Sequence, residues 1–521
     1  MEALKRDLLE ITSDVELRET HISWVFLADG DVWKVKKPVD LGFLDFRRPE
    51  QRKAACEAEI RLNRRLASDV YHGVVPITRD AKGRHRIGGE GEVVDWAVHM
   101  RRLPDRIRAD VMLEQGRLTA DHLRRVAERV AKFHAEQPTD DEIAGYGRPD
   151  AIAVNVRENF EQTRDTITAH VSEAEAGEIE QWQMAMLERE PERFEARVRQ
   201  GKVRDGHGDL RLEHVYLDED GSVTIVDCIE FNERFRYADV CSDVAFLSMD
   251  LAYEGRADLA EVFLAAYARA AGDHDLYGLV DFYESYRAYV RGKIMSMLAA
   301  DEDVAAATRD RAAKRARRYY LLALAAERSP LVPPAVVAVG GVIASGKSTV
   351  AERVSLALGA PVVDTDRTRK QMMHADPSEN LGAGAFQGAY AEEQTEAVYA
   401  EVLRRAEVVL RSGRPVILDA SFRRPAFRAQ ARDLACRREV PFRFVECRVA
   451  PEVARERLRA RGEGEVSDAR LDLFEDFLAS YEPVDELPEG EHLIVDTGRP
   501  LEENVAQLRE GLHAWPEGLV G

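Results

Sequence analysis

The sequence is poor in cysteine and in long apolar runs. Its 521 residues include five cysteines, and no two of them form a C-x-x-C pair: Cys56, Cys228, Cys241, Cys436 and Cys447. This scarcity argues against a disulfide framework or a structural zinc site and predicts a reduced, cytoplasmic protein. No apolar run reaches the length of a membrane-spanning helix, and the opening MEALKRDLLE is charged rather than signal-like. We therefore expect no membrane partner.

Positive charge is also scarce, because 74 lysines and arginines face 95 aspartates and glutamates, for a net charge of −21. This balance disfavours a general binder of nucleic acids or membrane surfaces. Residues 422–461 are a local exception, with twelve arginines against five acids. A nucleic-acid partner is thus unexpected but possible in the C-terminal part. The sequence gives no oligomeric state.

The length of the chain predicts more than one domain, since 521 residues exceed a single hydrophobic core. Three prolines fall between Arg328 and Pro334, and they favour an extended connector after a helix expected over 303–327. We therefore predict one domain over residues 1–330 and a second over 335–521.

The second domain opens with a complete G-x-x-x-x-G-K-[ST] phosphate loop, residues 341–348, between a strand expected at 335–340 and a helix expected at 347–358. Backbone N–H groups of such a loop surround phosphate oxygens, and the helix N-terminus favours negative charge. Lys347 would neutralise the β- and γ-phosphates of ATP, and the Ser348 hydroxyl would bind Mg²⁺. The expected nucleotide-binding residues are Gly341, Ser345, Gly346, Lys347, Ser348 and Thr349.

Strand and helix signals alternate from residue 335 onward, which predicts a parallel α/β sheet. Further strands are expected at 360–366, 415–421, 441–449 and 492–496. Ligands of such sheets bind at the carboxyl ends of the strands, so Lys347, Ser348, Asp366 and Asp419 should share one crevice. Two alternatives to a shared ligand site remain: Asp364 and Asp366 only form a turn at the end of the strand, and Asp419 caps a turn instead of holding Mg²⁺ through water.

The phosphate loop, the Asp366-x-x-Arg369 sequence and the acid at 419 resemble the small P-loop kinases of the polynucleotide 5′-kinase, zeta-toxin and chloramphenicol phosphotransferase types. The resemblance implies that Asp366 is the general base for the acceptor hydroxyl and that Arg369 holds the acceptor. It also implies an arginine-bearing lid over residues 454–464, from which Arg457 and Arg461 would reach the transferring phosphoryl group. A solvated charged helix is the alternative for any one of these arginines.

The strongest signal in the first domain is His207-Gly208-Asp209, followed by an apolar strand that ends at Asp227. This pattern resembles the catalytic loop of the aminoglycoside-phosphotransferase branch of the protein-kinase-like fold. The resemblance implies that Asp209 is the catalytic base and Asp227 the Mg²⁺-binding acid, and residues 239–245 (DVCSDVA) resemble the segment that follows in that family. One position departs from the pattern, because His214 stands where the family has an asparagine metal ligand. Either His214 binds the metal in an altered site, or Glu230 or water replaces it, or catalysis has been lost.

A β-hairpin expected over 24–37 carries Lys34 and Lys36 on one face, and a helix expected over 51–66 carries Glu57 and Glu59. A kinase-like fold needs a strand lysine for the α- and β-phosphates, paired with a helix carboxylate. We choose Lys34, with Lys36 close behind, and Glu59; solvated hairpin lysines are the alternative. Residues 100–103 fit the hinge between lobes.

We therefore predict an α+β, bilobal protein-kinase-like domain followed by an α/β P-loop domain. The predicted function is transfer of the γ-phosphoryl group of ATP, with Mg²⁺, to hydroxyl groups of small-molecule acceptors. Two alternatives remain open: a polynucleotide 5′-hydroxyl kinase, and an active P-loop kinase regulated by a non-catalytic N-terminal pseudokinase.

Overall fold

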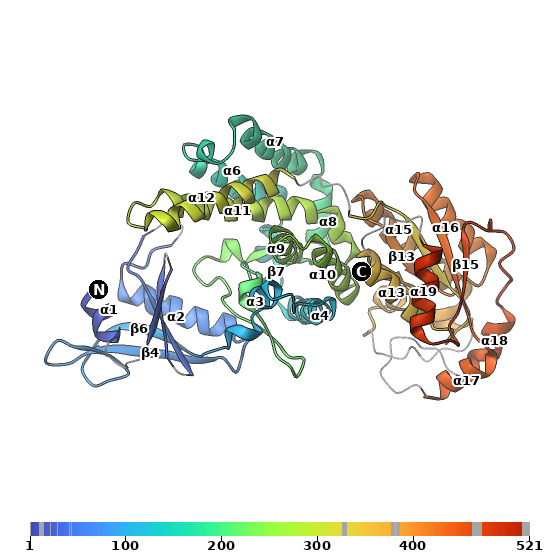
Figure 1. The fold of residues 1–521 in the computed structure, drawn as a ribbon, viewed down its shortest axis with the longest axis horizontal. Coiled ribbons are helices and arrows are strands. Elements are labelled where there is room, and N and C mark those ends of the chain that lie inside the picture. Colours follow the sequence, from blue (N-terminus) through green and yellow to red (C-terminus); the bar gives the residue numbers. More distant parts are fainter. Residues whose placement is uncertain are drawn as a thin grey trace. The chain divides into compact units, whose positions relative to one another are not determined.

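The computed structural model describes residues 2–9, 15–20, 22–28, 30–40, 42, 44–325, 331–376, 381, 386–460 and 471–512. The chain forms two compact units (Figure 1). The first contains Met1–Asp250 and Tyr286–Ala316, and the second contains Leu251–Ser285 and Arg317–Gly521. Three helices have residues in both units: α9 (Val240–Tyr253), α11 (Val280–Ala300) and α12 (Ala306–Leu324).

A six-stranded antiparallel sheet forms the start of the first unit. Its strands in spatial order are β1 (Glu16–Glu19), β2 (Ser23–Leu27), β3 (Asp31–Lys36), β6 (Glu92–Arg101), β4 (Tyr71–Arg79) and β5 (His85–Ile87). Successive strand residues point to opposite faces, so each face has its own apolar set. Trp24, Val35 and Ala97 pack with α1 (Glu2–Leu9), whereas Tyr71 and Val98 pack with α2 (Pro49–Asn63). The predicted hairpin and the helix after it are confirmed.

The rest of the first unit is mainly helical, with four short strands that hold the loop around Asp209. Val203–Asp205 (β7) pairs with Tyr237–Asp239 (β10), and Val215–Leu217 (β8) pairs with Val223–Ile225 (β9). The helices before β7 are α3 (Ala109–Glu114), α4 (Ala120–Glu136), α5 (Asp141–Gly145), α6 (Pro149–Thr163), α7 (Glu173–Arg189) and α8 (Pro191–Arg199). A small sheet followed by a helical part is the bilobal fold that the sequence predicts.

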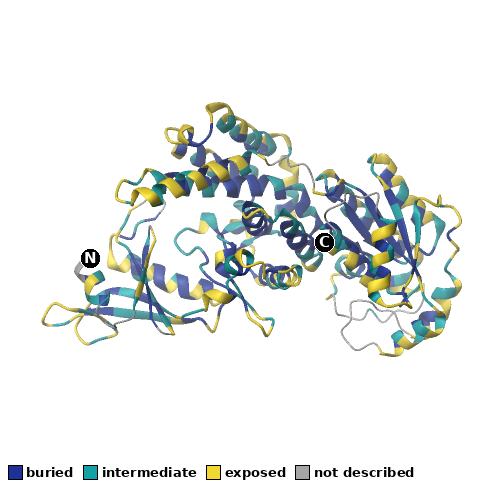
Figure 2. Ribbon diagram, viewed as in Figure 1, coloured by how far each residue is buried: buried dark blue, intermediate teal, exposed yellow. Residues whose placement is uncertain are grey.

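The second unit contains a five-stranded parallel sheet. Its strands in spatial order are β12 (Val362–Asp364), β13 (Val416–Asp419), β11 (Val336–Gly340), β14 (Phe442–Arg448) and β15 (His492–Asp496). Every residue of β11 is buried (Figure 2), as expected for a strand covered on both faces. The predicted parallel α/β sheet is confirmed.

Helices cover both faces of this sheet (Figure 1). Val337 and Val339 of β11 pack against α13 and α19, and Tyr399 of α15 stacks on Phe427 of α16 on the other face. The helices are α13 (Lys347–Leu358), α14 (Thr365–Met372), α15 (Glu392–Arg411), α16 (Pro425–Arg437), α17 (Pro451–Ala460), α18 (Phe474–Ala479) and α19 (Leu501–Gly511).

Residues from well before the proline-rich segment also belong to the second unit. Arg414 donates hydrogen bonds to Glu261 of α10 (Ala257–Ala271) at 2.8 Å and to Asp281 at 3.0 Å. Buried His274 lies with Nε2 3.0 Å from the Val362 carbonyl oxygen, and burial lowers the pKa of its imidazole to about 4. The second unit thus contains residues on both sides of 328–334. A domain division at residue 330 stays a prediction, and residues 328–330 lie outside the described part of the chain.

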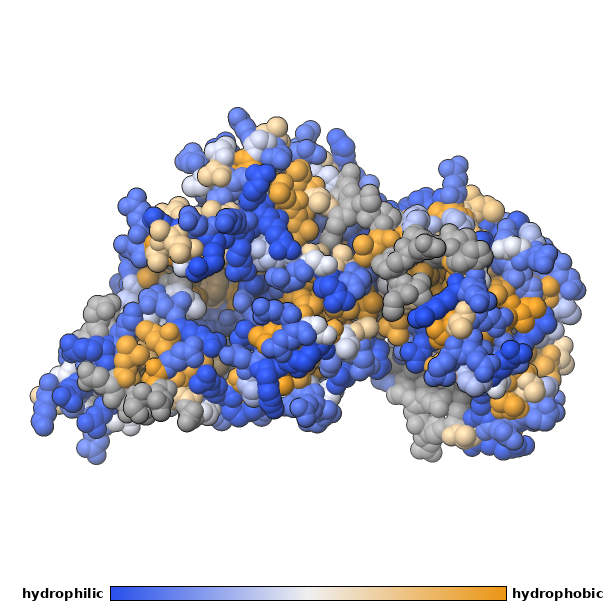
Figure 3. Space-filling view, viewed as in Figure 1, coloured by the Kyte–Doolittle hydropathy of each residue, from blue (hydrophilic) through white to orange (hydrophobic). Residues whose placement is uncertain are grey.

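The described helices include none with the length and apolar character needed to span a bilayer. Hydrophilic residues predominate on the face in Figure 3, and apolar residues form separate areas between them.

The Arg414 ion pairs predict a large stability effect at a position to which the sequence assigns no catalytic role. Arg414→Ala leaves the carboxylates of Glu261 and Asp281 without their cation, so we expect the free energy of unfolding of the second unit to fall by about 3 kcal/mol. Arg411→Ala is the matched control, because Arg411 pairs with Glu407 at the exposed surface, where such a pair contributes about 0.5 kcal/mol. Urea denaturation compares the two; equal losses would contradict the prediction.

Candidate nucleotide-binding and phosphotransfer sites

The phosphate loop joins β11 to α13, with Gly346 at the N-cap of the helix. Gly341 and Gly346 have φ of 142° and 84°, conformations that side chains rarely adopt. A Cβ at Gly341 would lie 2.4 Å from the Cys447 carbonyl oxygen, so the loop approaches β14 too closely for any other residue. The buried Ser345 hydroxyl has no hydrogen-bond partner within the described part of the chain. The loop therefore holds polar groups that its own residues leave unsatisfied, which fits a phosphate-binding turn.

Asp419 ends β13 directly beside the phosphate-loop strand, in register with Val339 of β11 and with Asp364 of β12. Its carboxyl group is buried and hydrogen-bonded by Ser348. Burial raises the pKa of Asp419 to about 6, against the opposing effect of the Lys347 ammonium group. A buried carboxylate beside a serine hydroxyl is the hard oxygen set that Mg²⁺ prefers. Three of the four residues predicted to share one crevice, Lys347, Ser348 and Asp419, thus lie together, and the place of Asp366 in that crevice stays a prediction.

The two acids at the end of β12 and the start of α14, Asp364 and Asp366, have different surroundings. Asp364 caps α14 by accepting a hydrogen bond from the Arg367 N–H at 2.7 Å, and Arg269 of α10 lies 3.8 Å away (Nε to Oδ2). The strand predicted over 360–366 is therefore too long, because this cap starts the helix at Thr365. Asp366 lies half-buried in the first turn of α14.

The arginines predicted for this site are held in place by backbone carbonyls. Arg369 is buried, donates to the Ala389 carbonyl oxygen and lies 4.5 Å from the Tyr390 ring centroid. Arg457 of α17 donates to Ala344 O in the phosphate loop at 3.2 Å and to Thr497 O at 2.5 Å. Arg457 therefore contacts the phosphate loop, and its role in a lid stays a prediction, whereas Arg461 lies outside the described residues. Thr349 lies in the first turn of α13.

In the first unit, the loop with Asp209 is fixed by two buried side chains. Asp243 accepts hydrogen bonds from the backbone N–H groups of His207 (2.6 Å) and Gly208 (2.8 Å). Burial lowers the pKa of His207 to about 4, so its ring is neutral: Nε2 donates to Val226 O at 3.0 Å and Nδ1 accepts from the Asp209 N–H at 3.2 Å. The backbone of Asp209 is thus set by hydrogen bonds on both sides.

Asp227 and His214 lie beside this loop. His214 Nδ1 is 2.8 Å from the backbone oxygen of Asp209, so Nδ1 carries the proton and donates it. Its Nε2 lies 3.5 Å from Asp227 Oδ2. Asp227 has φ of 67°, and the Lys34 and His214 side chains outweigh its desolvation and lower its pKa. The imidazole of His214 and the carboxylate of Asp227 thus face one another where the family pattern expects two metal ligands.

Lys34 and Lys36 point to the same side of β3 and share Glu59 of α2. Lys34 Nζ lies 3.0 Å from Glu59 and 2.5 Å from Asp227, whereas Lys36 Nζ lies 2.6 Å from Glu59 and also contacts Glu230. Burial disfavours both ammonium groups, but the carboxylates outweigh it and raise the pKa of each lysine. The predicted lysine–glutamate pairing is present with both lysines. Glu230 is engaged by Lys36, and Glu57 lies on the exposed side of α2 beside Lys53.

Sequence reasoning missed the positioning residues. Asp243 falls in the segment 239–245, so the resemblance of that segment gave a signal for it. No sequence signal indicated that Arg269 contacts Asp364 or that Glu230 contacts Lys36, since the two residues of each pair are 95 and 194 positions apart in the chain.

Two family models match the chain, the phosphotransferase enzyme family over residues 28–283 and an AAA domain over residues 336–484. Uncharacterized proteins from Mycobacterium tuberculosis and Mycobacterium bovis are 34% identical to it over 501 residues, which is 96% of this chain and 95% of theirs.

Solved structures resemble each part. A gluconokinase from Sinorhizobium meliloti is 23% identical, covering 35% of this chain and 93% of its own, with a TM-score of 0.26. Wild-type aminoglycoside 2′-phosphotransferase-IIIa is 16% identical, covering 61% and 97%, with a TM-score of 0.36. The assignment rests on the family models and the mycobacterial relatives: the chain belongs to the same family as these mycobacterial proteins and is an ATP-dependent phosphotransferase that joins a phosphotransferase-family domain to a P-loop kinase domain.

Proposed function

We propose that both units transfer the γ-phosphoryl group of ATP to hydroxyl groups of small-molecule acceptors, each with its own nucleotide site. The observation that carries this proposal is the presence of two separate cation-and-carboxylate sets. Lys34, Glu59 and Asp227 form the first, with Lys34 bridging both acids. Lys347, Ser348 and Asp419 form the second, around the phosphate loop. Each set holds what phosphoryl transfer needs, a cation for the phosphates and oxygen ligands for a metal.

In the first unit, Lys34 would leave Asp227 to bind the phosphates when nucleotide enters. Its side chain is 12% exposed and borders the partly exposed Asp227, whereas the side chain of Lys36 is fully buried between Glu59 and Glu230. Lys34 is therefore the better phosphate ligand and Lys36 holds Glu59. Asp209 would accept the proton of the acceptor hydroxyl, on a loop whose position Asp243 and His207 fix.

The donors beside Asp209 also bear on the metal of the first unit. Mg²⁺ bound there would neutralise charge that develops between the phosphates. Asp227 and His214 would hold it, and the nitrogen donor makes this site less suited to Mg²⁺ than a set of oxygen ligands alone. An asparagine-like oxygen is absent at His214, and Glu230 is already paired with Lys36.

In the second unit, Lys347 would bind the β- and γ-phosphates, while Ser348 and Asp419 would hold Mg²⁺. Asp366 would orient the acceptor hydroxyl from the first turn of α14, and Arg369 would bind the acceptor. Arg457 would hold the phosphate loop in place, because its guanidinium group donates a hydrogen bond to the Ala344 carbonyl oxygen.

Two other functions make different predictions. A pseudokinase role for the first unit rests on His214, and a polynucleotide 5′-kinase rests on the arginines of 422–461. Many of those arginines are paired with acids, as are Arg424, Arg432 and Arg455, which favours small acceptors.

We also infer a reducing, cytoplasmic location, because all five cysteines lie in the described residues and are free thiols.

A product screen separates these functions. Wild type, Asp209→Ala and Lys347→Ala are incubated with ATP and either Mg²⁺ or Mn²⁺, with sugars, polyols, aminoglycosides, nucleosides and a 5′-hydroxyl oligonucleotide as acceptors. We expect Asp209→Ala and Lys347→Ala each to lose one product by at least about 100-fold and to keep the other. Silencing of every reaction by Lys347→Ala alone, with Asp209→Ala fully active, would overturn the two-kinase proposal.

The two strand lysines should differ in what they support. Lys34→Met should abolish nucleotide binding at the first site with little loss of stability, because Glu59 keeps Lys36 and the partly exposed Asp227 keeps His214 as a neighbour. Lys36→Met should lower the free energy of unfolding by about 3 kcal/mol or more, since Glu59 and Glu230 are buried. Nucleotide titration and urea denaturation of both variants test this; the reverse pattern would assign the phosphates to Lys36.

Asp419 should trade stability for metal binding. The pKa of Asp419 is about 6 in the folded protein, above the ordinary 3.8. Ionisation of this buried carboxyl group therefore lowers the free energy of unfolding by about 3 kcal/mol above about pH 6 and has no effect on it below about pH 4. Asp419→Asn should therefore stabilise the metal-free protein at pH 7 and abolish Mg²⁺-dependent nucleotide binding at the second site. In the wild type this binding should weaken as the pH falls through 6.

Thermal denaturation and nucleotide titration between pH 5 and 8 measure both effects. Asp433→Asn, at an exposed position on α16, is the control and should change neither. Destabilisation of the metal-free protein by Asp419→Asn at pH 7 would contradict this account.

A further inference from the structure

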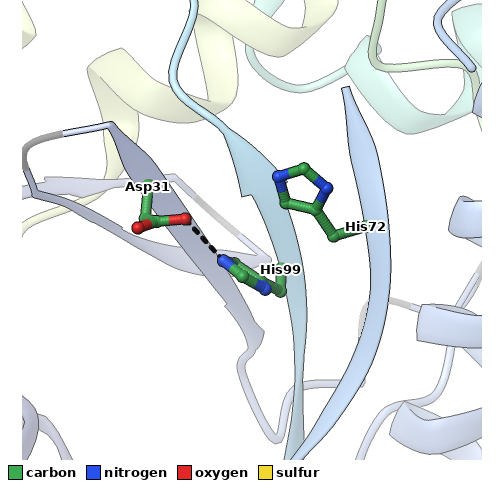
Figure 4. A group of neighbouring side chains, drawn as sticks. All are labelled: Asp31, His72 and His99. Atoms are coloured by element: carbon green, nitrogen blue, oxygen red, sulfur yellow. Dashed lines mark hydrogen bonds and ion pairs between the residues drawn. The ribbon is translucent and has the colours of Figure 1, made fainter. Parts of the chain in front are cut away.

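Two histidines and one aspartate gather on the six-stranded sheet of the first unit, away from its nucleotide residues. Among the described residues, Asp31, His72 and His99 form a group whose ligand atoms all lie within 4.8 Å of one another. They come from three neighbouring strands, β3, β4 and β6, and Figure 4 shows their side chains side by side. His99 Nε2 lies 2.6 Å from Asp31 Oδ1, and the rings of His72 and His99 are 4.9 Å apart.

The group lies on the opposite face of the sheet from Lys34. Trp33 pairs with His99 in the β3–β6 register, and Lys34 pairs with Val98. Neighbouring strand residues point to opposite faces, so His99 shares the face of Trp33 while Lys34 points to the other. Trp33 stacks on the His99 ring with centroids 5.5 Å apart and an interplanar angle of 11°. The function proposed for the first unit therefore leaves these residues unexplained.

An irregularity in β4 brings His72 to this face. In the pairing of β4 with β6, Tyr71 lies opposite Met100 and Gly73 lies opposite His99, so His72 is an extra residue in the ladder. Such bulges turn a side chain in a new direction and are frequent beside functional sites. Tyr71 packs toward α2, and the bulge places His72 on the other face next to His99.

Asp31 forms no ion pair with the arginine that lies opposite it in the sheet. Arg101 is the residue opposite Asp31 in the register, but its guanidinium group contacts Asp69 at 2.5 Å. Asp31 instead faces the imidazole of His99. Two imidazoles and a carboxylate are the donors that Zn²⁺ takes in proteins, with water as a fourth ligand.

We propose that Asp31, His72 and His99 bind a zinc-class divalent transition metal ion on this face of the sheet. Ligand atoms around one tetrahedral Zn²⁺ lie about 3.4 Å apart, so the His99–Asp31 contact would open by about 1 Å and His72 would turn inward. The ion would tie β3, β6 and β4 together where β6 ends at Arg101, just before the predicted hinge. The ion would take no part in phosphoryl transfer, because it would lie on the opposite face of the sheet from Lys34.

Zinc titration of the untagged full-length protein, with excess Mg²⁺ present, tests the site. We expect one Zn²⁺ per chain, and at least tenfold weaker binding in His72→Ala, His99→Ala and Asp31→Asn. His85→Ala is the matched control, because His85 of β5 pairs with Asp7 of α1 (Nδ1–Oδ2 2.8 Å) and belongs to no such three-residue group in the described part of the chain. Its affinity should equal that of the wild type.

Trp33 gives a second readout that needs no ligand variant. Co²⁺ or Cu²⁺ at this site should quench Trp33 fluorescence, and Trp33→Phe should remove most of that quenching. Equal zinc affinity in the wild type and in a His72→Ala/His99→Ala variant would overturn the proposal. If the histidine variants fail to fold, quenching that persists unchanged in Trp33→Phe, or zinc binding absent from the wild type, would overturn it as well.

Discussion

Charge buried inside this protein must be neutralised by other side chains, and the sites are built from the pairs that do so. In the first unit, Glu59 is fully buried and is held by Lys34 and Lys36 together. Because Glu59 lies on α2 and both lysines lie on β3, this pairing fixes the helix against the sheet. It also leaves Lys34 between Glu59 and Asp227, the position from which a lysine can turn to bound phosphates.

The same constraint acts on the loop that carries Asp209 and on the phosphate loop. Asp243 satisfies two backbone N–H groups of the first loop, and burial keeps His207 neutral so that both of its nitrogens are used. In the second unit, Asp419 is the opposite case: desolvation outweighs the cation and hydroxyl beside it and raises its pKa. A carboxyl group held at this cost is suited to binding a metal ion, which would supply the missing positive charge.

The elements of the second unit follow from local sequence signals. Glycines at 341 and 346 and an unbroken apolar run before them predict β11 and α13 with nearly the observed bounds. The strand predicted over 360–366 was too long, because the cap that Asp364 forms on α14 depends on the direction of one side chain. Spacing likewise predicts that Lys34 or Lys36 pairs with Glu59, but not that both do so.

The features that the sequence does not predict depend on contacts between residues far apart in the chain. The bonds from Arg414 to Glu261 and Asp281 join positions 153 and 133 residues apart, and no local pattern connects them. The bulge that turns His72 toward His99 depends on how β4 pairs with β6, which the alternation of either strand alone does not reveal. Arg457 was predicted from a lid resemblance, which does not predict its observed contact with Ala344 O, and its role in phosphoryl transfer stays a prediction.

The central claim is that one chain holds two independent nucleotide sites. Equilibrium titration with a non-hydrolysable ATP analogue and Mg²⁺ or Mn²⁺ tests it most directly, on the wild type, Lys34→Met, Lys347→Ala and the double variant. The account predicts two bound nucleotides per chain in the wild type, one in each single variant and none in the double variant. A single bound nucleotide in the wild type that is lost in Lys347→Ala and retained in Lys34→Met would contradict it.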